Sequence, residues 1–327
     1  MPNVLIGPTS LRGRPGPFRE ILEAAGFRPI DPPGDQTLTV ADLRATLPEV
    51  DAMLAAGERI TAELLDLAPR LRVIARTGVG YDAVDVAAAT ARRVAVVITP
   101  GTNHESVAEQ TFALMLALTR DVVNNDMIIR AGGWSRALVQ PLRGKTLGLV
   151  GLGRIGRAVA TRALAFGMRV VGHDTLADAD FDARHSIVRL DLDALLAESD
   201  VVSLHLPLTV QTRGLFDRAT LARMRPGSYL INTARGGLVV EADLAEALAS
   251  GHLAGAGLDV LDDEPSGPDN PLLGLSNVVF SPHVGGLDVR AMADMAEMAA
   301  RCIVKLFRGQ WPAGCVVNDE LAASWSW

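Results

Sequence analysis

Short apolar runs alternate with stretches of helical periodicity along the first hundred residues. Runs bounded by turn residues are typical of buried strands, whereas apolar positions three and four apart indicate helices. The expected strands are Val4–Ile6, Ala52–Ala55, Arg72–Arg76 and Val94–Ile98, and the expected helices are Phe18–Ala25, Ala62–Leu67 and Val86–Thr90. This alternation predicts a parallel sheet with short helical crossovers.

A second alternating series follows the turn sequence Thr99-Pro100-Gly101, which is the strongest candidate domain boundary. A long Ala/Leu-rich helix is expected from about Ser106 to Thr119. The expected strands are then Thr146–Val150, Met168–His173, Val201–Leu206, Ser228–Asn232, Ala254–Val260 and Asn277–Ser281. Six such strands make a complete doubly wound sheet, so the last long helix, near Val289–Phe307, is expected to return to the first domain.

The predicted fold class is therefore α/β, with two Rossmann-like doubly wound parallel-sheet domains. Residues 101–286 form one domain, and residues 1–100 with 287–327 form the other, which is discontinuous and flavodoxin-like.

Composition narrows the possible functions. Aromatic residues make up only 4% of the chain and hydrophobic residues 49%, which suits aliphatic strands covered by Ala/Leu helices. The net charge of −7 and the absence of a basic run disfavour nucleic-acid binding. No apolar run approaches the roughly 20 residues of a membrane helix, and the N-terminus lacks a signal-peptide pattern, so a cytoplasmic protein is expected. Two separated cysteines, Cys302 and Cys315, predict neither a disulfide framework nor a metal site.

A dinucleotide-binding pattern occurs where a strand is followed by a helix. Gly151, Gly153 and Gly156 follow the strand that ends at Val150, in the spacing G-x-G-x-x-G. In this context the first glycine makes a tight turn, the second lets the backbone approach a pyrophosphate, and the third allows close helix–strand packing. The helix N-terminus then supplies N–H donors to the phosphates.

Asp174 ends the next strand, where a carboxylate can accept hydrogen bonds from the ribose hydroxyls and repel a 2′-phosphate. The residues that follow, Thr175-Leu176-Ala177, offer no Arg for such a phosphate. The pattern therefore predicts NAD rather than NADP. The alternative is that Asp174 merely caps the following turn.

Arg235, Glu264 and His283 each follow a different predicted strand of the second series. Because ligands bind at the carboxyl edge of open α/β sheets, we expect the three side chains to converge there. Arg235 can hold a carboxylate through two hydrogen bonds, and His283 can exchange a proton with a substrate oxygen. Glu264 is expected to orient the imidazole and favour its protonated form, so that reduction is favoured at lower pH. Taken singly, each could be an ordinary loop or surface residue.

The whole pattern resembles the D-isomer-specific 2-hydroxyacid dehydrogenase family, in particular its phosphoglycerate dehydrogenase-like branch. The resemblance covers nearly the entire chain. It rests on the segments 76–85, 99–103, 106–109, 151–156, 204–209, 232–237, 258–260, 263–265 and 281–286. The pair Leu287-Asp288 departs from the small residues and Thr that family members often carry there, which alters the hinge or the cleft wall.

The resemblance implies an NAD-dependent enzyme that moves a hydride to or from C2 of a small D-2-hydroxy or 2-oxo acid. It implies a nucleotide-binding domain at 101–286, a substrate domain from the remainder, and closure between them that excludes water. It also implies a homodimer, with the Asn103–Gly133 region and Trp134 as a dimer arm. The implied cofactor contacts are Arg154, Ile155, His205, Thr209, Thr212, Thr233, Ala234, Asp259 and Gly285, besides the glycines and Asp174. For His205, an ordinary strand-end histidine is the alternative.

The backbone of Val79-Gly80, with Asn103, is implied to meet the substrate carboxylate. Arg76 and Arg136 resemble positions that bind phosphorylated substrates, with Arg136 reaching a partner's cleft, although solvated surface charges are the alternative for both. A further Arg is missing from the segment 55–58, where only Arg59 could substitute. This leaves 3-phosphoglycerate and glyoxylate or hydroxypyruvate as candidate substrates. An NAD(H)-sensing corepressor-like binding protein could carry the same motifs and is the alternative of another class.

Overall fold

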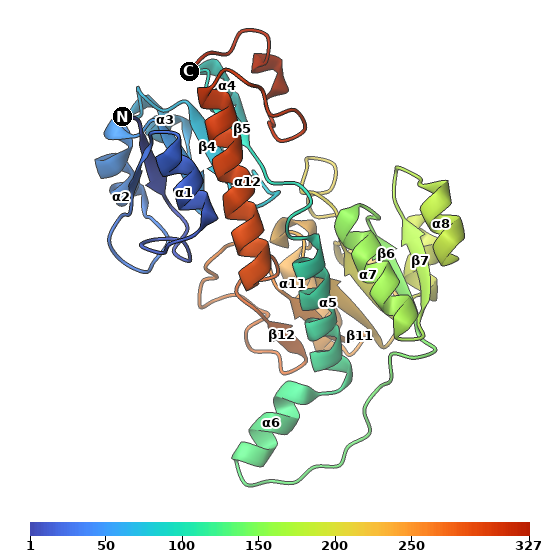
Figure 1. Ribbon diagram of the computed structural model, residues 1–327. Coiled ribbons are helices and arrows are strands. Elements are labelled where there is room, and N and C mark those ends of the chain that lie inside the picture. Colours follow the sequence, from blue (N-terminus) through green and yellow to red (C-terminus); the bar gives the residue numbers. More distant parts are fainter. The chain divides into compact units, whose positions relative to one another are not determined.

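The computed structural model describes residues 1–327, which divide into two compact units. One unit is Met1–Asn103 with Leu287–Trp327, and the other is His104–Gly286. Each contains one sheet in which every strand pairs in parallel with its neighbours, covered by helices on both faces (Figure 1). The predicted α/β class with two doubly wound parallel sheets is therefore confirmed.

The sheet of the first unit has five strands in the order β2-β1-β3-β4-β5. This is the order of flavodoxin-like sheets. Nearly all side chains of four strands are buried, as expected for strands covered on both faces, whereas the edge strand β2 is partly exposed. The strands are β1 (Asn3–Ile6), β2 (Arg28–Ile30), β3 (Ala52–Ala55), β4 (Val73–Arg76) and β5 (Ala95–Val97).

Helices from both ends of the chain cover the first sheet. Its helices are α1 (Pro17–Ala24), α2 (Val40–Thr46), α3 (Ala62–Asp66), α4 (Val86–Ala91) and α12 (Val289–Phe307), with the 3-10 turns η1 (Leu47–Glu49) and η3 (Asp319–Leu321). Helices α1 and α12 share one core with the sheet, and α2, α3 and α4 share the core on its other face. The last helix thus belongs to the first unit (Figure 1).

A buried amide fastens the C-terminal segment to the sheet of the first unit. Asn318 is 1% exposed, and its Oδ1 accepts the Val96 N–H at 2.9 Å. Its Nδ2 donates to Val94 O and to Thr90 Oγ1. The Val96 N–H and the Val94 carbonyl are buried, so this one side chain replaces bonds that these groups would otherwise make to water.

The sheet of the second unit has seven strands in the order β12-β11-β10-β9-β6-β7-β8, one more than predicted. The extra strand has only two residues and contains a charged side chain, so it shows no apolar run. The order reverses between β6 and β9, which is the switch point where such sheets bind ligands. The strands are β6 (Thr146–Val150), β7 (Arg169–His173), β8 (Val188–Arg189), β9 (Val201–Leu204), β10 (Ser228–Asn232), β11 (Leu253–Leu258) and β12 (Val278–Phe280).

Helices cover both faces of this second sheet as well. They are α5 (His104–Thr119), α6 (Val122–Arg130), α7 (Arg154–Ala165), α8 (Ala179–His185), α9 (Leu192–Glu198), α10 (Arg218–Arg223) and α11 (Glu241–Ala249), with the 3-10 turn η2 (Gly236–Leu238). Helices α5 and α7 pack side by side on one face (Figure 1). Helices α9, α10 and α11 contribute to the core on the other face.

Strand β2 and helices α2 and α6 were not predicted from the sequence. Helix α6 has no buried residue, and its apolar residues occur in two runs, Val122-Val123 and Met127-Ile128-Ile129, and not in the regular spacing of three and four by which surface helices are recognised. It is separated from α5 by Asp121, whose φ of 52° ends the preceding helix. None of the helices combines the length and apolar character that a membrane span requires.

Candidate active site

Hydrogen bonds join the carboxyl ends of three neighbouring strands in the second unit. The Asp259 N–H, just after β11, donates to Asn232 O at the end of β10 at 2.9 Å. The Asp259 carbonyl oxygen accepts the His283 N–H, beyond β12, at 2.7 Å. The loops that follow these strands are therefore tied to one another at a single edge of the sheet.

The Asp259 side chain is 1% exposed and holds the segment after β12. Its Oδ1 accepts from Ser281 Oγ at 2.5 Å and from Val284 N at 3.0 Å, and its Oδ2 accepts from Gly285 N at 2.8 Å. A Cβ at Gly285 would lie 2.8 Å from Oδ2, so the close approach requires glycine. This structural role of Asp259 could not be read from the sequence, where the residue drew attention only through the family resemblance.

His283 and Glu264 are in direct contact. The imidazole Nδ1 lies 2.6 Å from Glu264 Oε2, and Glu264 Oε1 accepts the Leu261 N–H at 3.1 Å. The His283 backbone has a φ of 54°, which is uncommon for a residue with a side chain. Because Nδ1 faces the carboxylate, Nε2 is the nitrogen left to face a ligand.

Arg235 follows β10 and is positioned by Asn232, whose Nδ2 donates to Arg235 O at 2.8 Å. The pKa of Glu264 lies below its ordinary value. Burial raises this pKa, but the hydrogen bond and charge of His283, the Leu261 N–H and the charge of Arg235 together lower it further. The structure thus brings the three predicted residues to the same edge, with the cation of Arg235 acting on Glu264.

The glycine-rich turn lies between β6 and α7 at the switch point. Gly151 has a φ of 102°, and a Cβ there would lie 2.5 Å from His205 O. A Cβ at Gly156 would lie 2.1 Å from Gly151 O, so these two positions require glycine for the packing of the turn itself.

Gly153 differs, because a Cβ there would meet no protein atom within 4 Å. It is exposed and precedes the first turn of α7, whose N–H groups at Arg154, Ile155 and Gly156 have no acceptor within the helix. Open space beside several N–H donors fits the phosphates of a dinucleotide.

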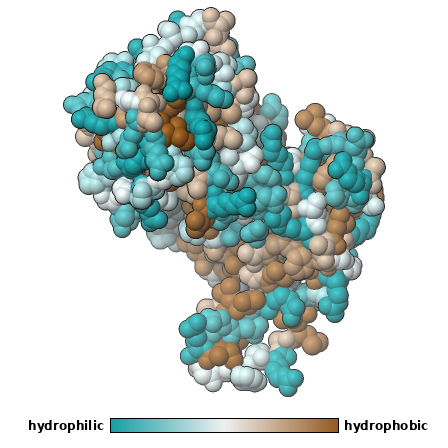
Figure 2. Space-filling model, in the orientation of Figure 1, coloured by the Kyte–Doolittle hydropathy of each residue, from teal (hydrophilic) through white to brown (hydrophobic).

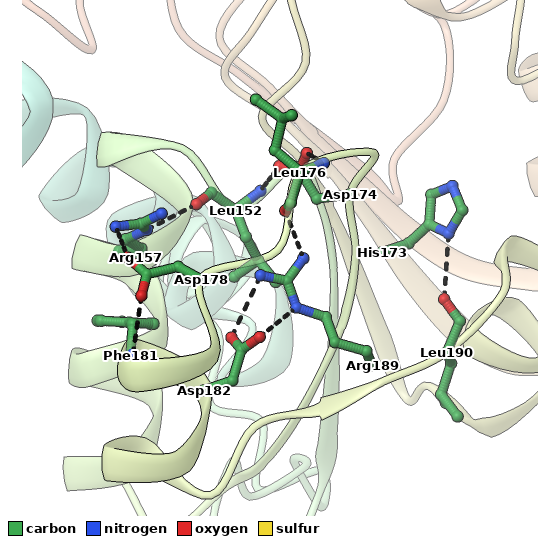
Figure 3. Close-up of polar contacts among 10 residues, drawn as sticks. All are labelled: Leu152, Arg157, His173, Asp174, Leu176, Asp178, Phe181, Asp182, Arg189 and Leu190. Carbon is green, nitrogen blue, oxygen red and sulfur yellow. Dashed lines mark hydrogen bonds and ion pairs between the residues drawn. The ribbon is translucent and has the colours of Figure 1, made fainter.

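Asp174 follows β7 at the same edge (Figure 3). Its Oδ2 accepts the Leu152 N–H at 2.6 Å and its Oδ1 accepts the Leu176 N–H at 2.8 Å. Burial raises the pKa of Asp174, but these N–H groups and the nearby Arg189 lower it below the ordinary value. Each carboxylate oxygen can accept about two hydrogen bonds, so capping the turn and binding a ribose are compatible.

Comparison with known proteins agrees with this architecture. The model of the D-isomer specific 2-hydroxyacid dehydrogenase NAD binding domain matches residues 112–285. The chain is 43% identical over 268 residues to the glyoxylate reductase of Korarchaeum cryptofilum, covering 80% of each chain. The chain belongs to the D-isomer specific 2-hydroxyacid dehydrogenase family. It is thus an NAD-binding oxidoreductase of this family, as the sequence predicted.

The chain is also 43% identical over 289 residues to D-3-phosphoglycerate dehydrogenase of Mycobacterium leprae. That match covers 86% of this chain but 54% of the relative, so the chain spans about half the length of that enzyme. Among solved structures, that of the TT0316 protein of Thermus thermophilus superposes on this chain with a TM-score of 0.86 and is 41% identical to it. The match covers 96% of this chain and 99% of the TT0316 chain.

The remaining cofactor contacts implied by this family also lie after strands of the second sheet. Thr209 and Thr212 bond to each other in the turn after β9, with the Thr209 N–H donating to Thr212 Oγ1 at 2.8 Å. Thr233 is buried beside Thr111, and Ala234 follows it. Their roles toward a cofactor remain predictions.

His205 lies beneath the glycine-rich turn. Burial lowers its pKa to about 3, and its Nε2 lies 3.0 Å from Ser203 Oγ. Its Nδ1 is buried with no hydrogen-bond partner. The ring is therefore neutral at physiological pH, so any contact with phosphates would be a hydrogen bond and not an ion pair.

The predicted substrate residues fall in different parts of the chain. In the first unit, Arg76 Nε donates to Gly80 O at 3.1 Å, which shapes the loop containing Val79. Asn103 is partly exposed at the end of the unit's first segment. Arg136 belongs to the second unit, where it lines a shallow hollow with Ile129 and Trp134 beyond α6. No group of three or more His, Cys, Asp or Glu side chains is arranged to hold a metal.

Replacing Gly153 by Ala is expected to weaken NADH binding about tenfold or more, because the new methyl group occupies the open space beside the α7 N-terminus. The free energy of unfolding should change by no more than about 0.5 kcal/mol, since the methyl group meets no protein atom. NADH fluorescence titration and urea denaturation measure the two quantities.

Gly274→Ala is the matched control, because a Cβ at Gly274 also meets no protein atom within 4 Å. It should leave both quantities unchanged. Equal NADH affinity of the wild type and Gly153→Ala would contradict the placement of the phosphates at this turn.

Proposed function

We propose that this chain uses NADH to reduce the C2 carbonyl of a small, unphosphorylated 2-oxo acid, either glyoxylate to glycolate or hydroxypyruvate to D-glycerate. The observation that carries the proposal is the 2.6 Å contact of Glu264 with His283 at the sheet edge that also bears Arg235. His283 can exchange a proton while Glu264 holds its imidazole, and the Arg235 guanidinium can bind a carboxylate through two hydrogen bonds. This combination suits proton transfer to a 2-oxo acid.

Each of the three side chains has a separate task. The Arg235 guanidinium binds the substrate carboxylate and so orients the neighbouring C2 carbonyl. His283 donates a proton from Nε2 to the carbonyl oxygen, and Glu264 stabilises the protonated imidazole through Nδ1. NADH bound along the glycine-rich turn supplies the hydride to C2. In the reverse direction His283 takes the proton back.

The preference for an unphosphorylated acid rests on Glu58. This residue lies beyond β3, at the same edge of the first sheet as Arg76, and it is 1% exposed. Its Oε2 accepts the Ala56 N–H at 2.5 Å, and a Cβ at Gly7 would lie 2.6 Å from its Oε1. The segment predicted to lack an Arg thus presents an inward carboxylate, while Arg59 is exposed. A segment without a cation gives a phosphate no charge-assisted partner, which favours an unphosphorylated acid. The equal 43% identities to a glyoxylate reductase and to a D-3-phosphoglycerate dehydrogenase do not distinguish the two substrate classes.

A panel of 2-oxo acids with NADH tests the proposal. Glyoxylate and hydroxypyruvate should oxidise NADH, whereas phosphohydroxypyruvate should have a kcat/KM at least about tenfold lower, because its phosphate meets no cluster of cations.

Replacing Arg235 by Ala should reduce kcat/KM for the preferred acid about a hundredfold or more, because the carboxylate loses its charge-assisted bonds.

Exclusive turnover of phosphohydroxypyruvate would contradict the substrate assignment and favour 3-phosphoglycerate. In that case Arg76→Ala and Arg136→Ala should each lower kcat/KM. With an unphosphorylated substrate, Arg136→Ala should leave it unchanged.

Glu264→Gln is expected to shift the pH dependence of reduction. The pKa of Glu264 lies below its ordinary value of 4.5, so its charge is present throughout the neutral range and lost only as the pH falls through the lowered pKa. Without that charge the protonated imidazole is less stable. The high-pH limb of the kcat/KM profile should therefore move to lower pH, and kcat/KM at neutral pH should fall about tenfold or more.

Asp263→Asn removes the neighbouring, exposed carboxylate and is the control for a general loss of charge. Its profile should match that of the wild type. A Glu264→Gln enzyme that loses rate with an unmoved profile would indicate that Glu264 acts only on the fold of its loop.

The arm formed by α6 and the segment to residue 138 is proposed as the interface with a second copy of the chain. It exposes apolar side chains to solvent, namely Val122 53%, Val123 44%, Met127 54%, Ile129 50%, Trp134 82% and Leu138 100%. Figure 2 shows apolar groups on this projecting part at the bottom of the view. Such a concentration of apolar surface is typical of an association site.

Met127→Asp combined with Trp134→Glu should convert the dimer to a monomer, because charges on both copies would have to be buried in the interface. Sedimentation velocity measures the mass. Val289→Asp changes a side chain that is 91% exposed outside the arm and should leave the dimer intact. A wild-type protein that sediments as a monomer would contradict the proposed interface.

A further inference from the structure

Arg189 places a cation behind the turn that begins at Asp174, and its position there was not predicted from the sequence. Arg189 is at the end of β8, the strand that pairs with β7, and its register partner is Gly172. The carboxyl ends of β7 and β8 thus meet at one edge, although Asp174 and Arg189 are separated in sequence by helix α8. Arg189 Nη1 donates to Leu176 O at 3.2 Å, two residues after Asp174.

Asp182 of α8 holds this guanidinium in place. Arg189 Nε lies 2.7 Å from Asp182 Oδ2, and Nη2 lies 3.2 Å from Oδ1. The side chains are 24% and 13% exposed, so the pair is partly shielded from solvent. Figure 3 shows the guanidinium between the Asp182 carboxylate and the turn at Asp174–Leu176. Nη1 carries two N–H groups, and Leu176 O accepts one of them.

The charge of Arg189 already acts on the carboxylate predicted to face the ribose. It contributes to the lowering of the Asp174 pKa, after the backbone N–H groups of Leu176 and Leu152. A phosphate on the ribose 2′ oxygen would enter the same surroundings. There it would meet the negative charge of Asp174 and the positive charge of Arg189, whose Nε and Nη2 are held by Asp182 and whose Nη1 keeps one N–H group for a phosphate oxygen.

We propose that Arg189 is a second determinant of cofactor choice, a cation positioned for a 2′-phosphate whose effect Asp174 overrides. The preference for NAD then depends on the Asp174 charge alone, and removing that charge allows NADP to bind through Arg189. This inference rests on the proposed NAD site at the glycine-rich turn. It identifies Arg189, and not a residue of the 175–177 turn, as the phosphate-binding cation.

Binding of 5′-AMP and 2′,5′-ADP, measured by isothermal titration calorimetry on the full chain, tests this inference without requiring turnover. The wild type should bind 5′-AMP at least about tenfold more tightly than 2′,5′-ADP, because Asp174 repels the second phosphate. Asp174→Ser should raise the affinity for 2′,5′-ADP about tenfold or more, and added salt should reduce the gain. Asp174→Ser/Arg189→Ala should lose that gain while binding 5′-AMP as Asp174→Ser does.

Two further double variants separate charge from folding. Asp174→Ser/Arg189→Lys keeps a cation beside Asp182 and should retain part of the gain. Asp174→Ser/Arg169→Ala removes a cation from the opposite end of β7, where Arg169 pairs with Glu198 at 2.8 Å, and should retain all of it.

Equal 2′,5′-ADP affinity of Asp174→Ser and Asp174→Ser/Arg189→Ala would overturn the role of Arg189 and leave the NAD site standing. A wild type that binds neither nucleotide would contradict the NAD site itself, and this inference with it.

Discussion

The arrangement of the candidate catalytic residues at the carboxyl edge of the second sheet depends on one buried carboxylate. Asp259 accepts three hydrogen bonds from the segment after β12, and its backbone links that segment to the end of β10. A buried carboxylate without these donors would be costly, so the segment has little freedom to adopt another conformation. His283 lies within this segment, and its distance to Glu264 is therefore set by a group that itself need not touch a substrate. The same constraint explains Gly285, because a Cβ there would collide with the carboxylate.

The nucleotide half of the site depends on a different constraint, which is the absence of side chains. Gly151 and Gly156 allow the turn to pack against the end of β9 and against itself, whereas Gly153 leaves space open outside the protein. Three glycines of one motif thus serve two purposes, internal packing and access for a ligand. Burial lowers the pKa of His205, which lies under this turn, to about 3, so the positive character of the turn comes from its backbone N–H groups and from Arg154, and not from His205.

Charge at the edges of the two sheets is arranged locally and does not follow the net charge of −7. Arg189 of β8 is paired with Asp182 of α8, and the charge of Arg235 acts on Glu264 of another loop. Glu58 is a buried carboxylate at the edge of the first sheet. The proposed selection of substrate and cofactor thus rests on individual side chains, on a fold shared with relatives named as glyoxylate reductase and D-3-phosphoglycerate dehydrogenase.

The sequence by itself determined the fold class, the glycine motif, Asp174 and the three residues at the second sheet's edge. These could be predicted because strands buried on both faces produce apolar runs, and because parallel strands bring their carboxyl ends together. The tertiary structure alone decided the contacts of Asp259, the inward turn of Glu58 and the position of Arg189 behind Asp174. Helix α6 and strand β8 also escaped prediction, since the apolar residues of α6 lack regular helical spacing and β8 has only two residues. Pairings between residues far apart in sequence depend on strand order and helix packing, which local periodicity does not encode.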